Sequence, residues 1–162
     1  MKSKVKTTDR GLQITRIFDA PRSEVFGWWA DAGKLRQWSA CKDATSCEVV
    51  MDFRVGGSFT QRMQIAVNGN TCEFSFTGTY EEIAVPEKIS YRADLGQSKT
   101  HVTVEFFDHG DGTKIVLTQD GLSEPCACTS VSQGTQESFD KLASILSEIG
   151  VFNGISLETE GT

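Results

Sequence analysis

Apolar and polar residues alternate along residues 12–18, where Leu12 and Ile14 flank Gln13, and this pattern predicts a β-strand with one buried face. Pro21 ends the strand and suits the first turn of a helix, because the N–H that proline lacks has no partner there. Three apolar residues at helical spacing then predict a short helix: Val25, Phe26 and Trp29.

A second short helix is predicted after Asp31, a residue type favoured at the N-cap, and this helix carries Leu35 and ends near Trp38. From about Cys47 the two-residue period returns and predicts about six further strands separated by Gly-, Asn- and Pro-containing turns. Gly78, inside the longest of them, predicts a β-bulge or the close approach of another backbone. The predicted strands cover residues 47–55, 58–65, 72–85, 88–95, 102–106 and 115–119.

The last predicted element is a long helix, which places Phe139, Leu142, Leu146 and Ile149 on one face. We expect a loop over residues 121–130 before it and an end at Gly150. The polar residues 1–10 and the acidic tail 151–162 are expected to be flexible.

This order of elements predicts one α+β domain over residues 11–150. Consecutive hairpins imply an antiparallel sheet of about six or seven strands with one face toward water. The sheet is expected to curve around the long C-terminal helix. A concavity that the helix does not fill is then the natural site for a small ligand.

Composition narrows the possible partners. The chain has 162 residues and a net charge of −6 without a basic cluster, which argues against nucleic acid and against an anionic membrane surface. No run approaches the ~20 apolar residues of a membrane span, and the basic N-terminus lacks the apolar run of a signal peptide. The five cysteines are odd in number, so we expect reduced thiols and a cytoplasmic location.

Several stretches together resemble the START-like (SRPBCC, helix-grip) superfamily, in the branch related to the C-terminal domain of the Hsp90 ATPase activator. The resemblance covers about residues 12–149, in the order of that family. It is carried by residues 16–26, by Leu35 and Trp38, by Asp52-Phe53-Arg54-Val55-Gly56-Gly57-Ser58-Phe59, by Gly78-Thr79-Tyr80-Glu81-Glu82-Ile83, by Pro86-Glu87-Lys88-Ile89 and by residues 102–106 and 112–118.

The resemblance implies a helix-grip fold with a cavity between the sheet and the long helix. It does not imply one activity, because the superfamily includes lipid carriers, polyketide cyclases and co-chaperone domains. The family often has Gly-Trp where the last helix begins, whereas this chain has Gly134-Thr135. Loss of the indole is expected to remove packing at the cavity mouth or to enlarge the cavity.

The sequence offers few candidates for catalysis or metal binding. Cys126-Ala127-Cys128 has too short a spacer for structural zinc and no second cysteine pair, so we predict no metal and no cofactor. Of the two histidines, His109 falls in a hairpin turn, and His101 faces away from the cavity if Val102 faces into it.

Glu81 and Glu82 are adjacent in a predicted strand and are therefore expected to point to opposite faces. One of them is a candidate acid or base inside the cavity, where burial would raise its pKa. A solvated strand end before Pro86 is the alternative that we favour.

Gln119 continues the inward face of Ile115 and Leu117, so its amide is expected to enter the cavity and to need a partner from protein, water or ligand. The predicted ligand-binding residues are Trp38, Arg62, Phe76, Tyr80, Tyr91, Val104, Phe106, Leu117, Gln119, Phe139 and Leu142.

Three hypotheses for function follow. The first is a module that binds a small hydrophobic or amphipathic ligand, with Gln119 and Tyr80 orienting it. The second, from the resemblance alone, is an interaction protein for an Hsp90-type chaperone, ranked lower because the chain lacks the additional N-terminal domain of the full activator. The third is a cyclase- or hydrolase-type enzyme that uses Glu82 with Tyr80, or His101 turned inward. A homodimer through an exposed strand edge or the region of the second helix is compatible with each hypothesis.

Overall fold

The computed structural model describes residues 4–7, 11–40, 44–94, 99–122 and 125–161. It contains one eight-stranded antiparallel sheet and three helices. The elements in chain order are β1 (Lys4–Thr7), β2 (Gly11–Phe18), α1 (Arg22–Ala30), α2 (Ala32–Trp38), β3 (Ala44–Met51), β4 (Ser58–Val67), β5 (Asn70–Ala84), β6 (Lys88–Asp94), β7 (Lys99–His109), β8 (Gly112–Asp120) and α3 (Pro125–Gly161).

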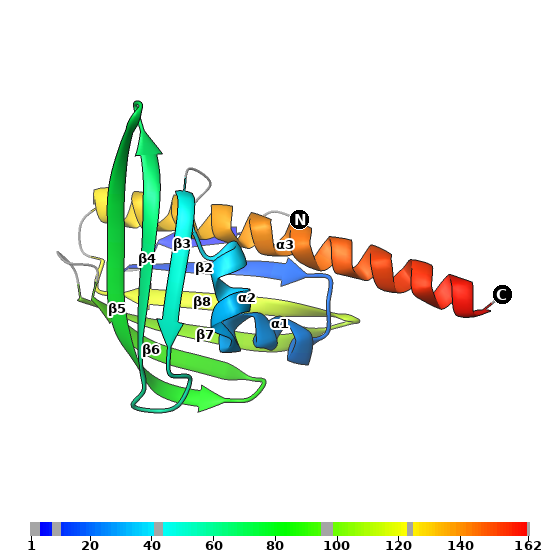
Figure 1. Ribbon diagram of the computed structural model, residues 1–162. Coiled ribbons are helices and arrows are strands. Elements are labelled where there is room, and N and C mark those ends of the chain that lie inside the picture. Colours follow the sequence, from blue (N-terminus) through cyan, green and yellow to red (C-terminus); the bar gives the residue numbers. More distant parts are fainter. Residues whose placement is uncertain (1–3, 8–10, 41–43, 95–98, 123–124, 162) are drawn as a thin grey trace.

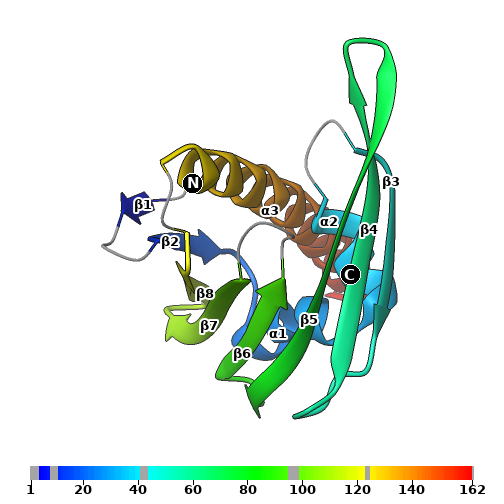
Figure 2. The ribbon, with the colours of Figure 1, turned by 90° about the vertical axis from the view of Figure 1, so that its left-hand side faces the viewer.

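The sheet is strongly curved, and its strand order is β1-β2-β8-β7-β6-β5-β4-β3. Helix α3 lies across its concave side (Figures 1 and 2). Helices α1 and α2 fill the space between strands β2 and β3 of the sheet. The predicted helix-grip architecture is therefore confirmed.

The local signals explain most element boundaries. Asp31 caps α2 by accepting a hydrogen bond from the Lys34 backbone N–H at 3.0 Å. Asn68 and Gly69 both have positive φ angles, 51° and 81°, as a two-residue hairpin turn requires. This β4–β5 hairpin extends beyond the rest of the molecule (Figure 1).

The elements at the two chain ends differ from those predicted. Residues 4–7, predicted to be flexible, form β1 and pair with β2, where Val5 is the partner of Ile14. Helix α3 begins at Pro125 and continues past Gly150 to Gly161, whereas the sequence suggested a loop over 121–130, an end at Gly150 and a flexible tail. Proline is tolerated in a helix's first turn, and glycine inside a helix costs only about 1 kcal/mol, so neither residue forces a boundary.

The core concentrates at the end of the concavity that α1 covers. Phe26 and Trp29 pack on Phe106, with ring centroids 5.0 Å and 5.1 Å apart. On the other side of this cluster the Phe18 ring meets Phe139 of α3 edge to face at 5.6 Å. These aromatic contacts fill one end of the concavity.

Candidate ligand-binding cavity

A cavity of about 700 Å³ occupies the other end of the concavity, between strands β4 to β8 and helices α2 and α3. Its described lining is dominated by aromatic side chains, namely Trp29, Trp38, Phe59, Phe74, Phe76, Tyr80, Tyr91 and Phe139. The aliphatic part comprises Leu35, Met63, Ile65, Ile89, Ala93, Val102, Leu117, Leu122 and Val131. Alternation along each strand is what directs these apolar side chains to one face.

Two indoles form the wall where the cavity meets the core. The Trp29 and Trp38 rings lie 4.5 Å apart. Trp38 Nε1–H donates to the backbone carbonyl of Trp28 at 3.0 Å, so its single polar group is satisfied within the protein. The Trp38 ring therefore presents only hydrocarbon to the cavity.

The floor carries a cluster of three rings. Phe59 lies 5.2 Å from Tyr80 and 5.1 Å from Tyr91, and the two tyrosine rings lie 6.1 Å apart. Burial raises the pKa of Tyr80 well above its ordinary value, and it raises the pKa of Tyr91 to about 12. Both phenols are neutral hydrogen-bond donors at physiological pH.

Gln119 projects from β8 and is buried. Its Nε2 donates to Thr100 Oγ1 at 3.2 Å, and Thr100 Oγ1 in turn donates to the Ala93 carbonyl at 3.1 Å. This chain fixes which way the amide is turned, so the carbonyl oxygen of Gln119 remains as an acceptor at the cavity wall.

Gln61 on β4 is a second buried amide, and the sequence pattern did not single it out. Its Nε2 donates to the Ser39 carbonyl at 3.1 Å and to Cys47 Sγ at 3.7 Å. Burial raises the pKa of the Cys47 thiol, which keeps it protonated and uncharged. The polar groups at this side of the cavity are thus neutral as well.

The described lining of the cavity includes no charged side chain and no histidine. Its polar members are hydroxyls and amides: Ser39, Gln61, Tyr80, Tyr91, Gln119, Thr135 and Ser138. A charged ligand would lose its hydration without gaining a counter-charge from these residues. The arrangement therefore suits a neutral molecule.

Comparison with known proteins identifies the family. A family model described as "Activator of Hsp90 ATPase homolog 1-like protein" matches residues 19–147. The chain belongs to this family. This match confirms the resemblance inferred from the sequence. No curated protein matches the chain.

Solved structures share the fold of this family member. A protein from Rhizobium leguminosarum is 28% identical with a TM-score of 0.68, and the match covers 91% of this chain and 97% of that one. A Chromobacterium violaceum protein is 24% identical with a TM-score of 0.72, over 82% and 94% of the two chains. An Arthrobacter aurescens protein is 19% identical with a TM-score of 0.79, over 90% and 91%.

The structure places the predicted site residues in three groups. Those that line the cavity are Trp38, Phe76, Tyr80, Tyr91, Leu117, Gln119 and Phe139. Val104, Phe106 and Leu142 are buried in the core and do not line the cavity. Arg62 was placed wrongly: it lies on the outer face of the sheet, 3.6 Å from Glu73, while its neighbours Gln61 and Met63 point inward.

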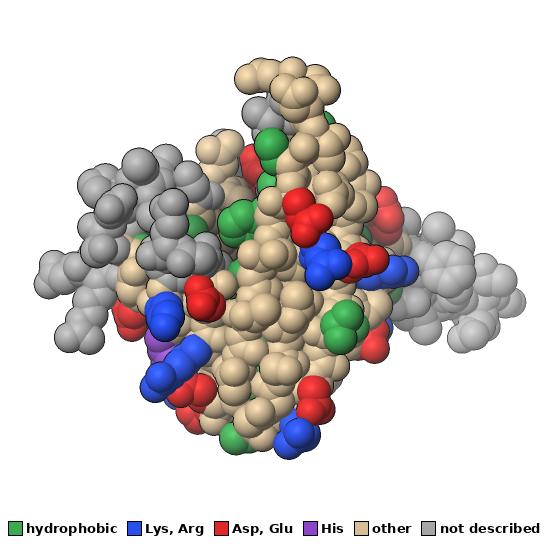
Figure 3. Space-filling view, turned by 60° about the vertical axis from the view of Figure 1, so that its left-hand side comes forward, with side chains coloured by type: hydrophobic (Ala, Val, Ile, Leu, Met, Phe, Trp, Pro, Cys, Tyr) green, Lys and Arg blue, Asp and Glu red, His purple; other side chains and the backbone are tan. Residues whose placement is uncertain are grey.

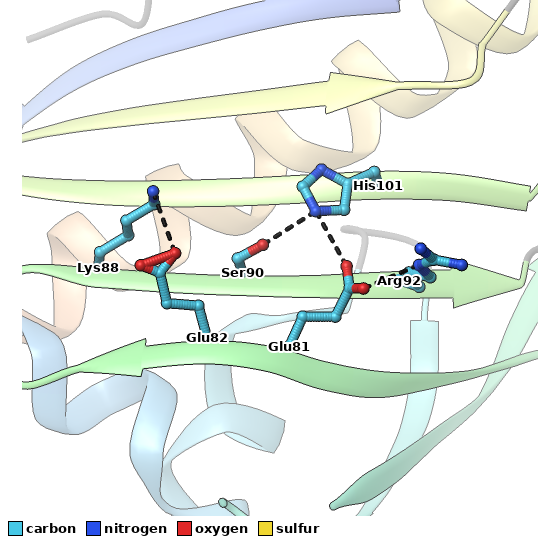
Figure 4. A network of polar contacts seen from close by, with 6 residues as sticks. All are labelled: Glu81, Glu82, Lys88, Ser90, Arg92 and His101. Carbon is cyan, nitrogen blue, oxygen red and sulfur yellow. Dashed lines mark hydrogen bonds and ion pairs between the residues drawn. The ribbon is translucent and has the colours of Figure 1, made fainter. Parts of the chain in front are cut away.

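The prediction for Glu81 and Glu82 is also corrected. A β-bulge between Tyr80 and Glu82 inserts an extra residue, so both carboxylates share the outer face of the sheet instead of pointing to opposite faces. Glu82 lies 3.2 Å from Lys88 Nζ, and Glu81 lies 2.9 Å from Arg92 Nε (Figure 4). Neither carboxylate enters the cavity.

His101 faces away from the cavity, as predicted. Its Nε2 lies 3.0 Å from both Ser90 Oγ and Glu81 Oε1 on the outer face (Figure 4). Acidic and basic side chains lie beside one another over this face and do not form a patch of one sign (Figure 3). Of the groups that the enzyme hypothesis required inside the cavity, Glu82 and His101 are therefore outside it, whereas Tyr80 lines it.

Two further predictions concern metals and membranes. Among the described residues no group of three or more His, Cys, Asp or Glu side chains is placed to hold a metal ion. The side chains of Cys126 and Cys128 lie outside the described residues. In the described part of the chain, no helix combines the length and the hydropathy that crossing a membrane requires.

Proposed function

We propose that this family member is a binding protein for a small, neutral, largely apolar molecule held in the cavity between the sheet and α3. The observation that carries the proposal is an aromatic-lined cavity of about 700 Å³ whose described polar groups are all uncharged. Pockets of this size, apolar with a few polar groups, are typical of small-molecule sites.

The size of the cavity supports useful affinity without catalysis. A ligand that buries about 250 Å² of apolar surface gains roughly 6 kcal/mol before the costs of association. Tyr80, Tyr91 and Gln119 then orient it through hydrogen bonds.

The proposed entrance lies between the β4–β5 hairpin and α3. Phe74 on the hairpin lines the cavity yet is 40% exposed, so it marks the boundary with solvent. Across from it, Gly134 and Thr135 of α3 also line the cavity. The small side chains at these two positions, where the family often has Gly-Trp, leave the entrance open.

A thermal-shift series with matched neutral and anionic ligands tests the proposal. Because a ligand that binds only the folded state stabilises it, decanol at about 100 times its Kd is expected to add about 2.7 kcal/mol and several degrees to the Tm. Decanoate of the same chain length is expected to give a much smaller shift, since the described lining offers its charge no partner. Equal shifts for both compounds would contradict a neutral site.

Thr135→Trp is the matched control for cavity binding. Thr135 lines the cavity and is only partly buried. An indole at position 135 is expected to fill this space, so the ligand-induced Tm shift falls strongly while the ligand-free protein stays folded. An undiminished shift in Thr135→Trp would place ligand binding elsewhere on the molecule.

A chaperone partner is the second candidate, because the matching family is described by its relation to an activator of Hsp90 ATPase. The experiment is a pull-down with a purified Hsp90 together with its ATPase rate. Absence of both binding and a rate change would reject this candidate without affecting the ligand-binding proposal.

A further inference from the structure

The polar groups of the cavity floor lie in one row across the sheet. Tyr80 on β5 is the register partner of Tyr91 on β6, which pairs with Val102 on β7, which pairs with Gln119 on β8. All four residues line the cavity. Neighbouring strands are about 4.8 Å apart, so along this row Tyr91 lies about 10 Å and Tyr80 about 14 Å from Gln119, with the small Val102 side chain between Tyr91 and Gln119.

The two phenols differ in their hydrogen bonding from the two amides and from the Trp38 indole around them. The amide N–H groups of Gln119 and Gln61 and the indole N–H of Trp38 all donate to protein acceptors. Among the described residues, neither the Tyr80 nor the Tyr91 hydroxyl donates to a protein acceptor, and neither oxygen is sealed off from the cavity that both residues line. Tyr80 is only 4% exposed, so its hydroxyl has little access to bulk solvent.

A tyrosine hydroxyl that donates to no protein group gives the folded state nothing that phenylalanine would not supply by packing in the ring cluster with Phe59. Two such hydroxyls on directly paired residues of adjacent strands therefore point to a group that arrives with the ligand. Both are donors, which requires an acceptor on that group. A carbonyl oxygen has two lone pairs and carries no charge, so it accepts from both phenols in a site without a described counter-charge.

We propose that Tyr80 and Tyr91 together bind the carbonyl oxygen of a neutral aromatic ketone whose ring system lies over Val102 toward Gln119. This inference rests on the proposed function, since it assigns the chemistry of the same cavity. It adds a class of ligand, an aryl ketone, and it gives the two tyrosines a shared role as hydrogen-bond donors.

The experiment uses Prodan, a neutral naphthyl ketone whose fluorescence shifts to the red when its carbonyl accepts hydrogen bonds. Bound to the unmodified protein, Prodan is expected to emit at a longer wavelength than when bound to Tyr80→Phe or Tyr91→Phe. Each substitution is expected to weaken binding about threefold to tenfold, the range for one neutral hydrogen bond. Thr79→Val, which removes an exposed hydroxyl from the opposite face of β5, is the matched control and is expected to change neither quantity.

Failure of the aryl ketone inference and failure of the proposed function give different results. If Prodan binds the unmodified protein and both phenylalanine variants with the same affinity and emission, the two phenols do not bind its carbonyl oxygen. The cavity still binds ligands in that case. If decanol raises the Tm and Prodan does not bind, the aryl ketone assignment is wrong and the proposed function stands. If neither compound binds, both proposals are overturned.

The ligand-free variants supply a second readout. Because the hydroxyls have no described protein partner, Tyr80→Phe and Tyr91→Phe are expected to leave the Tm unchanged or raised. A clear loss of stability in either variant would assign that hydroxyl a structural role and would contradict the inference.

Discussion

At Gly78 an added Cβ atom would lie 2.3 Å from Phe59 Cζ and 2.4 Å from the carbonyl oxygen of Arg92. Gly78→Ala is therefore expected to lower the free energy of unfolding by about 1–3 kcal/mol, because the neighbouring strand and the floor of the cavity must move. Gly134→Ala is the control, since its methyl group meets nothing within 4 Å and alanine favours helix by about 1 kcal/mol. Urea unfolding is expected to give effects of opposite sign, and equal effects would contradict this account.

Tyr80 and Tyr91 are the only tyrosines in the chain, so tyrosinate absorbance reports on them alone. With a pKa of about 12, Tyr91 in the folded protein is expected to be only about one-tenth ionised at pH 11, whereas an unfolded tyrosine with a pKa of about 10 is largely ionised. A single ionisation near pH 10 in the folded protein would contradict the burial of the two phenols.

The same shift makes stability depend on pH. The folded state keeps the Tyr91 proton after the unfolded state has lost it, so the stabilisation is complete below pH 10 and is lost as the pH rises toward 12. Tyr91 alone accounts for a loss of about 2–3 kcal/mol across this window. Urea unfolding of Tyr91→Phe is expected to show a flatter dependence on pH than the unmodified protein.

Single residues also show where sequence patterns succeed and where they fail. The alternation of Phe59, Met63 and Ile65 was sufficient to direct Gln61 inward and Arg62 outward, so that error was avoidable. The outward position of both Glu81 and Glu82 was not predictable, because a bulge changes the face of every following residue and leaves no signal in the alternation itself.

At the scale of elements, an ion pair joins α3 to β2. Arg16 Nη1 of β2 contacts Asp140 Oδ1 of α3, with the Arg16 side chain 6% exposed and the Asp140 side chain 69% exposed. Asp140→Asn leaves a buried guanidinium without its counter-charge and is expected to destabilise the protein by about 1–3 kcal/mol. Glu82→Gln, in an exposed pair with Lys88, is the control and is expected to cost less than about 1 kcal/mol.

Urea unfolding of the two variants distinguishes the two kinds of ion pair. Arg16→Met combined with Asp140→Asn is expected to recover part of the lost stability, because the unpaired charge is then gone. If Asp140→Asn costs no more than Glu82→Gln, the contact does not hold α3 on the sheet.

The elements themselves were largely predictable. The order of two short helices, antiparallel strands and a long helix followed from periodicity and from turn residues such as Asn68 and Gly69. Strand β1 was not predictable, because residues 4–7 are all exposed and carry no buried face to produce an alternation. The length of α3 was misjudged because Pro125 and Gly150 resemble boundaries although neither residue is incompatible with a helix.

At the scale of the whole molecule, the division between core and cavity was the least predictable feature. Val102, Val104 and Phe106 share one face of β7, yet only Val102 lines the cavity, and Phe26 and Trp29 of α1 pack on Phe106. Periodicity gives the inward face of a strand. Which part of that face a distant helix covers depends on the packing of the complete fold.

The central claim is that the concave side of the sheet holds a neutral apolar molecule. Native mass spectrometry of the purified protein, before and after incubation with decanol or Prodan, tests it most directly. The account predicts one retained ligand per chain in the unmodified protein and none in Thr135→Trp. Absence of any adduct with either compound, together with an unchanged Tm, would show that no ligand enters the cavity and would contradict the account.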